Sequence, residues 1–553
     1  MGLLCVGPPT FRLDFVPANS QLRRLRRPPV QSLRVPLMKQ NYHRVYLTLL
    51  SAKCARNVGR LMTPLRDSAR PSARPAILSP KSGPRMEKAM RLAFSASVMI
   101  LATSALAACE KNETKAPEPG ASASAAAAPA PPPAADKSGP IKVGILHSLS
   151  GTMAISETSL KDVALMAIDE LNAAGGVLGR KIEPIVVDPA SNWPLFAEKA
   201  RDLIQNQKVA VTFGCWTSVS RKSVLPVFEE LNGLLFYPVQ YEGEESSFNV
   251  FYTGAAPNQQ AIPAVEYLMS KEGGGAKRFV LLGTDYVYPR TTNKILRYFL
   301  HSKGITDDDI MEKYTPFSHS DYQTIVVEMK KFAQPKRTAV ISTINGDSNV
   351  PFYKELANQG IKAEDLPVIA FSVGEEELRG IDTKPLVGHL AAWNYFMSID
   401  TPENKSFIAK WKEYVKAKGL PGGDKRVTND PMEATYIGIQ MWAHAVEQAH
   451  DTDVDAVRQA IGYQKVKAPS GFEIQMDAAN HHLHKPVFIG EVKADGQFKT
   501  VWKTPGPIRA QAWSPFIPES AKKVADWTYP WVCGNCTEPK FSPGAKVLAA
   551  KAP

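Results

Sequence analysis

The chain has 553 residues, enough for two or more domains of ordinary size, and its 44% hydrophobic and 22% charged residues are typical of a globular protein. Its formal net charge is +12, but residues 1–85 carry 16 Lys and Arg against two Asp, so the remaining residues hold 50 basic and 52 acidic side chains. The positive charge of the whole chain therefore does not support a nucleic-acid partner for the folded part.

The N-terminal region has the features of an export signal. From Met86 the sequence has two basic residues, an apolar run from Leu92 to Leu101, and small residues up to Cys109, which are the three regions of a secretory signal peptide. The run is too short, and too often interrupted by Ser and Thr, for a membrane-spanning helix. We therefore expect residues 86–109 to be the signal, and the arginine-rich residues 1–85 to be a non-native or disordered extension.

A lipid anchor and a tether are expected next. Residues 106–109 read LAAC and resemble the bacterial lipobox, in which the cysteine is lipidated and becomes the mature N-terminus. Residues 110–139 are rich in Ala, Pro and Ser and contain no core-forming residue, which predicts a disordered tether. We expect a periplasmic or other extracytoplasmic protein that is held to a membrane through Cys109.

The folded part begins with a strand, a polar turn and a helix. An apolar run from Ile141 to Leu146 enters the turn Ser148 to Gly151, and apolar residues then recur with helical spacing from Leu160 to Leu171. The turn lies at the carboxyl end of the strand, where open α/β sheets hold small ligands. Glycines at 175, 176 and 179 end the helix before a second strand, Ile182 to Val187.

The same alternation continues along the chain and predicts an α/β fold. Alternating strands and helices imply right-handed crossovers and mostly parallel sheets. The expected helices are 197–204, 219–231, 260–270, 291–301, 322–332, 350–359, 402–418, 431–450 and 453–462, and the expected strands are 209–213, 233–237, 278–282, 338–343, 368–371, 471–474, 486–493 and 498–502. The turn-rich segment 252–257 separates two similar halves, which suggests two lobes facing each other across a cleft.

Six sequence blocks in order resemble the urea-binding subunit of bacterial urea ABC transporters. They are HSLSGTMAISE from His147, GGVLGR from Gly175, FYPVQYEGEESS from Phe236, GTDYVYPR from Gly283, INGDSNVPFY from Ile344 and AWNYF from Ala392. That subunit belongs with the branched-chain amino-acid and short-chain-amide binders among type I periplasmic binding proteins. The resemblance covers about residues 141 to 513.

The resemblance implies two Rossmann-like lobes with parallel-rich sheets, joined by three hinge segments, that close around a ligand. Lobe one is expected at 140–255 plus 390–465, lobe two at 256–389 plus 466–513, and a C-terminal extension at 514–553. The hinge candidates are 252–257, 388–393 and 469–473. The implied function is capture of urea and its delivery to the permease subunits of an ABC importer, without a cofactor, a metal, catalysis or a nucleic-acid partner.

Urea offers one carbonyl acceptor and four N–H donors, so its pocket needs donors on one side and acceptors on the other. The turn after the first strand is expected to form one wall, mainly through backbone donors, and polar residues that follow later strands supply the rest. Tyr237 and Tyr288 match pocket tyrosines of the amide binders. Ser218 is equally compatible with a helix cap, and Glu242 is expected to be solvated or to brace its loop. The candidate ligand-binding residues are Ser150, Gly151, Met153, Trp216, Thr217, Ser218, Tyr237, Gln240, Asp285, Tyr288, Thr343, Asn345 and Glu375.

Other signals carry less weight. The run HHLH at 481–484 is expected in a surface loop rather than at a metal. Cys533 and Cys536 form a lone CxxC, for which a small-loop disulfide is expected outside the cytoplasm, and Cys215 is expected to be buried. No hydrolase or phosphate-binding motif is found. The alternatives are a binder of short-chain amides or branched-chain amino acids, an amide sensor of the same fold, and a hydrolase acting on urea or amides.

Overall fold

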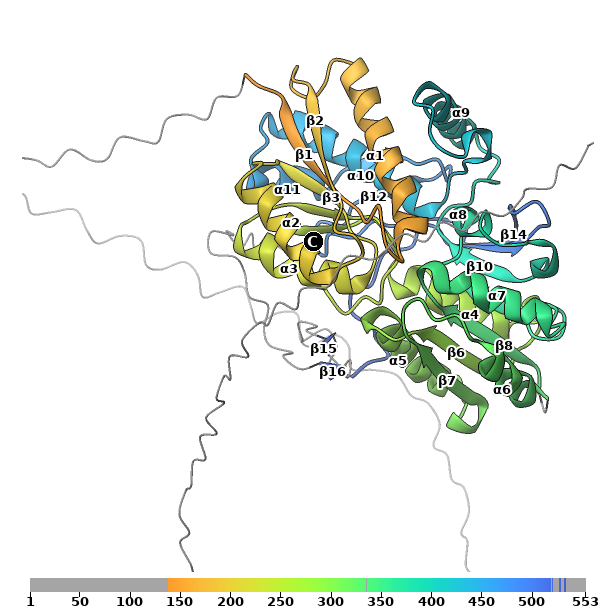
Figure 1. Ribbon diagram of the computed structural model, residues 1–553. Helices are drawn as coiled ribbons and strands as arrows, with labels where there is room; N and C mark the ends of the chain where they lie inside the picture. The colour runs from red at the N-terminus through yellow and green to blue at the C-terminus, as the bar shows by residue number, and fades with distance from the viewer. Residues whose placement is uncertain (1–137, 335, 519, 521–526, 529–531, 534–553) are drawn as a thin grey trace, which may run out of the picture. The chain divides into compact units, whose positions relative to one another are not determined.

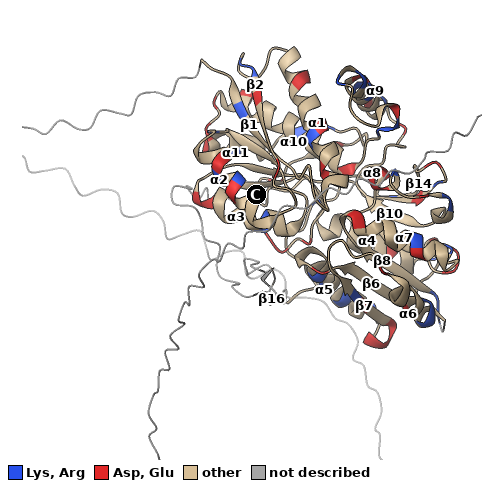
Figure 2. Ribbon diagram, in the orientation of Figure 1, with Lys and Arg blue, Asp and Glu red and all other residues tan. Residues whose placement is uncertain are grey.

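The computed structural model describes residues 138–334, 336–518 and 520, together with 527–528 and 532–533. The predictions for the basic extension, the signal peptide, Cys109 and the tether up to residue 137 lie outside this range. Among the described residues, no helix is both long and apolar enough to cross a membrane. Figure 2 shows acidic and basic residues interspersed along the described elements.

The first lobe is built on a five-stranded parallel sheet with the strand order β2-β1-β3-β4-β5. Its strands are β1 (Ile141–Leu146), β2 (Ile182–Val187), β3 (Val211–Gly214), β4 (Leu235–Tyr237) and β5 (Val250–Tyr252). Its helices are α1 (Ala154–Ala173), α2 (Trp193–Gln205), α3 (Ser218–Glu230), α9 (Pro402–Ala417), α10 (Asp430–Ala449) and α11 (Val454–Ile461). The predicted first and second strands are confirmed residue for residue.

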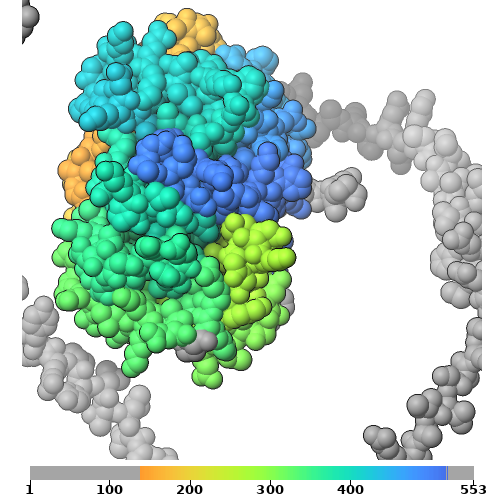
Figure 3. Space-filling view, turned by 90° about the vertical axis from the view of Figure 1, so that its right-hand side faces the viewer, coloured from red at the N-terminus to blue at the C-terminus, as the bar shows by residue number. Residues whose placement is uncertain are grey.

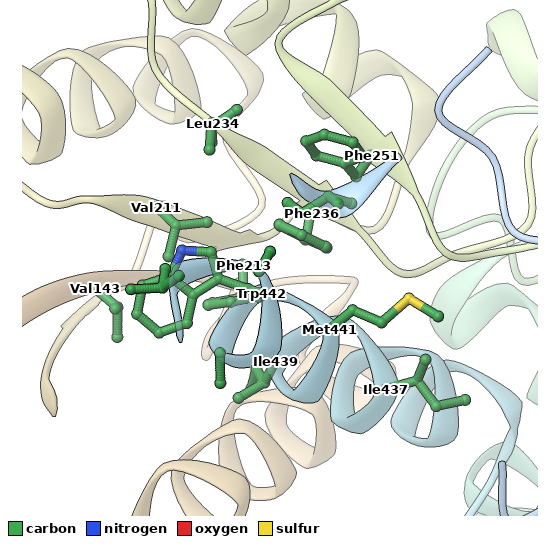
Figure 4. Packing of buried hydrophobic residues seen from close by; sticks show 14 of the residues in the cluster. Val143, Val211, Phe213, Leu234, Phe236, Phe251, Ile437, Ile439, Met441 and Trp442 are labelled. Carbon is green, nitrogen blue, oxygen red and sulfur yellow. The ribbon is translucent and has the colours of Figure 1, made fainter. Parts of the chain in front are cut away.

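Side chains of β1 alternate between two cores because successive residues of a strand point to opposite faces. Val143 and Ile145 belong to a cluster with Trp442 of α10, and Figure 4 shows Val143 close to that tryptophan. Gly144 faces the other way, where an added Cβ would lie 2.9 Å from Leu203 Cδ1 of α2. Glycine therefore allows α2 to pack closely on the sheet.

The second lobe is built on a seven-stranded mixed sheet with the order β14-β13-β10-β9-β8-β6-β7. Five of its strands are parallel, and β13 and β14 run antiparallel at one edge. The strands are β6 (Arg278–Thr284), β7 (Ile310–Thr315), β8 (Thr338–Thr343), β9 (Val368–Ala370), β10 (Leu390–Trp393), β13 (Phe488–Val492) and β14 (Phe498–Lys503). The helices are α4 (Ala261–Met269), α5 (Val287–Ser302), α6 (Gln323–Ala333), α7 (Asn349–Asn358) and α8 (Glu375–Leu378).

The second sheet is covered on both faces, which explains its continuous apolar strands. Phe279 and Leu281 of β6 pack with α4 and α5, while Val280 and Leu282 pack with α6 and α7. Figure 1 shows the two helix pairs on opposite sides of this sheet. The two lobes thus have the α/β architecture that the alternating pattern predicts.

Two predicted lobe boundaries are wrong. Lobe one was expected to resume at residue 390, but Leu390–Trp393 is strand β10, which pairs with β9 and β13 of the second sheet. Lobe two was expected to resume at 466, but β11 (Lys465–Lys467) and β12 (Glu473–Gln475) form a hairpin whose Ile474 packs in the first lobe's core. The hinge candidates 388–393 and 469–473 therefore lie inside the lobes, whereas 252–257 overlaps a connection between them.

Three connecting segments run between the lobes, at 253–260, 394–401 and 484–487. Asn394, in the second segment, links the other two. Its side-chain Nδ2 donates to the carbonyl oxygens of Gln259 in the first segment, at 2.9 Å, and of Pro486 in the third, at 2.6 Å. Buried Lys485 donates to the Thr253 carbonyl at 3.2 Å. In Figure 3 the late part of the chain, coloured blue, lies between the cyan and green parts.

The chain after β14 lies against both lobes. The backbone N–H of Ser514 donates to the Glu244 carboxylate at 2.8 Å, and the Phe516 ring meets the Phe299 ring at 5.2 Å between centroids. The short strands β15 (Trp527–Thr528) and β16 (Val532–Cys533) pair antiparallel. The predicted Cys533–Cys536 disulfide lies outside the described residues, since Cys536 and the side chain of Cys533 are not described.

Candidate functional site

The loop after β1 uses its backbone donors within the first lobe. The N–H of Ser148 donates to Glu157 at 2.8 Å, that of Leu149 to Asp188 at 2.9 Å, and that of Met153 to the Ser191 hydroxyl at 3.1 Å. The Ser150 hydroxyl also donates to Asp188, at 2.9 Å, and Gly151 is exposed at a φ of 80°. These three backbone donors of the predicted wall are therefore engaged by acceptors of the first lobe. Asp188 and Ser191, which follow β2, were missed.

The loop after β3 is also held from within. Thr217 caps α3 by accepting from the Ser220 N–H at 3.1 Å, and the Ser218 hydroxyl donates to Glu242. The helix cap weighed for Ser218 is thus provided by Thr217. Trp216 reaches the second lobe, where its Nε1 donates to Asn345 Oδ1 at 3.3 Å.

A buried arginine holds the loop after β4 through ion pairs. Arg221 of α3 forms ion pairs with Glu242 and Glu245, both at 2.8 Å, and its guanidinium lies over the Tyr237 ring at 4.7 Å. Burial opposes ionisation of Glu245, but Arg221 and Lys222 outweigh it and lower the pKa of Glu245 to about 2. Glu242 is fully buried, so its solvated alternative is wrong and its bracing role is confirmed. Tyr237 donates its hydroxyl to the Trp216 carbonyl.

Two of the predicted residues in the second lobe make contacts within that lobe. Asp285 follows β6 and pairs with Arg290 at 2.8 and 3.0 Å. Thr343 ends β8, and its side chain packs against Gly283 of β6. A Cβ added at Gly283 would lie only 2.4 Å from the Thr343 hydroxyl oxygen. Both contacts fix the edge of the second sheet.

The carboxyl edges of the two sheets meet through several polar contacts, including a buried ion pair between Arg426 and Glu376. In addition to the Trp216 bond to Asn345, Gln240 Nε2 donates to Ser372 Oγ at 2.9 Å. Two more contacts join Thr152 to Asp347 and Ser156 to Glu377, each at 2.6 Å. Residues from loops far apart in sequence are thus brought together, as the shared position of these loops on parallel sheets predicts.

Three buried polar atoms near this junction have no hydrogen-bond partner in the described residues: Gln240 Oε1, Tyr288 Oη and Glu375 Oε2. The Tyr288 hydroxyl lies near Ser372 and Gln240 without hydrogen-bond geometry to either, and burial raises its pKa. Because an unsatisfied buried polar group costs about 1–3 kcal/mol, such atoms mark positions suited to a polar ligand.

Glu375 is the most perturbed of these groups. Its Oε1 accepts from the Met397 N–H at 2.7 Å. Burial raises the pKa of Glu375 to about 8, the negative charges of Glu377 and Asp430 raise it further, and the Met397 bond opposes the shift. The raised pKa favours the protonated form of this carboxyl near neutral pH, in which its unpaired oxygen can donate a hydrogen bond.

The histidine run is not on the surface, so that prediction is wrong. His481 and His482 are buried, and burial lowers their pKa values to about 4 and 3. The His482 ring stacks on Tyr252 with centroids 4.2 Å apart, which holds the chain just before the third connecting segment against β5. Within the described residues, no group of three His, Cys, Asp or Glu side chains could hold a metal ion. Cys215 is buried, as predicted.

Comparison with known proteins identifies the family. A family model described as a periplasmic binding protein domain matches residues 141–519. Leu/Ile/Val-binding protein homolog 7 of Brucella melitensis is 25% identical over 385 residues, which cover 67% of this chain and 93% of that protein. A Geobacillus stearothermophilus protein named limonene hydroxylase is 33% identical over 148 residues, which cover 27% of this chain and only 26% of that protein.

Solved structures share the fold at low sequence identity. A solute-binding protein of an ABC transporter from Rhodopseudomonas palustris, in complex with 4-hydroxybenzoate, aligns with a TM-score of 0.59 and 22% identity, over 68% of this chain and 99% of that one. A branched-chain amino acid binding protein from Streptococcus pneumoniae, in complex with isoleucine, aligns with a TM-score of 0.55 and 18% identity, over 66% and 98%. The chain therefore belongs to the type I periplasmic binding proteins, the extracytoplasmic solute-binding components of ABC transporters.

Proposed function

We propose that this protein captures urea between its two lobes and delivers it to the permease subunits of an ABC importer, anchored to a membrane through Cys109. The observation that carries the ligand assignment is the set of three unpaired buried atoms, Gln240 Oε1, Tyr288 Oη and Glu375 Oε2. A protonated Glu375 would donate to the urea carbonyl, while Gln240 Oε1 and Tyr288 Oη would accept from its N–H groups. A small neutral ligand rich in N–H groups matches this set.

Carboxylate ligands match the same atoms less well. An amino acid or a benzoate needs a cation or several N–H donors for its carboxylate. The buried Arg221 is already paired with Glu242 and Glu245, and Glu375 would place a second carboxyl group beside such a ligand. Urea and short amides are therefore favoured over the ligands named for the relatives.

Ligand size limits the affinity. Urea has four heavy atoms, and a ceiling of about −1.5 kcal/mol per atom gives about −6 kcal/mol, or a Kd of about tens of micromolar. Losing one hydrogen-bond partner in the buried site would cost about 1–3 kcal/mol, which is how the site would reject an isostere.

Calorimetry with a ligand panel tests the proposal. Urea, acetamide, formamide, leucine and 4-hydroxybenzoate are titrated into the protein under one set of conditions. Saturable heat with urea, at an affinity above that for leucine, is expected. A response to leucine without one to urea would point to the branched-chain amino-acid alternative, and ammonia release in the same samples would point to a hydrolase.

A further inference from the structure

A buried hydrogen bond joins the lobes beside the candidate site. Ser156 lies in the first turn of α1 in lobe one, and Glu377 lies in the one-turn helix α8 of lobe two. The Ser156 hydroxyl donates to Glu377 Oε1 at 2.6 Å, and both side chains are 1% exposed. Helix α1 packs against α8, as Figure 1 shows at the lower end of α1.

The two oxygens of Glu377 have partners in different lobes. Oε1 accepts from Ser156 across the interface, whereas Oε2 accepts from the Gly374 N–H of its own loop at 2.9 Å. Separation of the lobes would break only the first bond. Glu375 lies two residues before Glu377 in the same helical turn, so this bond fixes the turn that carries the unpaired Glu375 oxygen.

We propose that Ser156 and Glu377 form a closure latch, in which they act as positioning residues that hold α8 against the first lobe and so set the ligand affinity without touching the ligand. The inference rests on the proposed function. Ser156 and Glu377 lie outside the set of candidate ligand-binding residues. Their proposed role is in closure of the lobes rather than in recognition of the ligand.

A second cross-lobe bond supports the assignment by comparison. Thr152 donates to Asp347 at 2.6 Å at a solvent-exposed position, where water competes for both groups. The Ser156 bond has the same length but is buried, and a hydrogen bond is stronger where water is excluded. The backbone near Thr152 is also close to the second lobe, since a Cβ added at Gly346 would lie 2.8 Å from the Thr152 carbonyl oxygen. The buried Ser156 bond is therefore expected to contribute more than the exposed Thr152 bond to holding the lobes together.

The test compares three variants of the full chain. Ser156→Ala removes the latch. Glu377→Gln keeps one oxygen to accept from the Gly374 N–H and places an amide N–H group that can donate to the Ser156 hydroxyl. Ser159→Ala is the matched control, because its buried hydroxyl donates to the Ser156 carbonyl at 2.9 Å within α1. Urea binding is measured by calorimetry, and urea dissociation by stopped-flow mixing. S156A is expected to raise the Kd by about tenfold or more, through faster dissociation. S159A and E377Q should remain near wild type.

Hydrogen exchange of the ligand-free variants separates this inference from the urea assignment. S156A should speed the exchange of amides 375–379 in the second lobe, while S159A should leave it unchanged. If the wild-type protein does not bind urea, the proposed function fails and the latch is judged from these amides alone. Equal exchange in both variants, or a wild-type Kd and dissociation rate in S156A, would overturn the latch.

Discussion

Glu375 is expected to make ligand binding dependent on pH. Its side chain is 1% exposed, and burial raises its pKa to about 8 from an ordinary value of 4.5. If the lobes open and return this carboxyl to water, it regains its ordinary pKa and loses its proton at neutral pH. Closure around urea is therefore expected to take up a proton at Glu375.

The size of the effect follows from proton linkage. Between pH 4.5 and about 8 the closed form binds one more proton at Glu375 than the open form, so closure is favoured at low pH and weakens as the pH rises. The loss is at most about tenfold in urea affinity for each pH unit, or about hundredfold from pH 6 to pH 8. Above about pH 8 the carboxyl is ionised in both forms, and the affinity no longer changes through this group.

Calorimetry in two buffers with different ionisation enthalpies measures this proton directly. The wild-type protein should take up about one proton for each bound urea at pH 7. Glu375→Gln should bind urea with no proton uptake at this site and with a flatter pH profile, because the amide still accepts from the Met397 N–H and still offers a donor. The same pH dependence in the wild-type protein and the variant would refute the role of Glu375.

Three further substitutions test the site and its support. Tyr288→Phe removes an unpaired hydroxyl but keeps the buried ring, so calorimetry should show urea affinity lowered by about tenfold with no change in the thermal unfolding midpoint; an unchanged affinity would place Tyr288 outside the pocket. Arg221→Met removes the arginine partner of buried Glu242 and Glu245, of which Glu245 keeps Lys222, and should lower the free energy of unfolding in guanidinium by about 3–5 kcal/mol, whereas Arg201→Met at an exposed pair should change it far less. Asn394→Ala removes two hydrogen bonds between connecting segments and should lower the same free energy by about 1–3 kcal/mol; a loss below that for Arg201→Met would contradict its tying role.

The order of strands and helices is what made the meeting of these loops predictable. The loops that carry Trp216, Gln240, Asn345 and Ser372 each follow a strand, and parallel strands bring their carboxyl ends to one edge. The contacts of Trp216 with Asn345, and of Gln240 with Ser372, follow from that rule. Which side chains face solvent, a ligand or another protein group depends on packing between distant segments.

Glu242 and the histidine run show this limit. The run YEGEES has the composition of a solvated loop, and nothing local indicates that Arg221, on a helix 21 residues earlier, lies inside that loop. His482 is buried because Tyr241 and Tyr252 flank it, and both rings belong to the first lobe. Strand β10 has only four residues, so its apolar run could not be told from a crossing segment by periodicity.

A crystal structure of the protein with bound urea tests the central claim most directly. Urea is expected between the lobes, with its carbonyl oxygen within hydrogen-bond distance of Glu375 and an N–H group at Gln240 Oε1, so that both lobes contact it. Urea bound to one lobe alone, or bound away from Glu375 and Gln240, would contradict the proposed site.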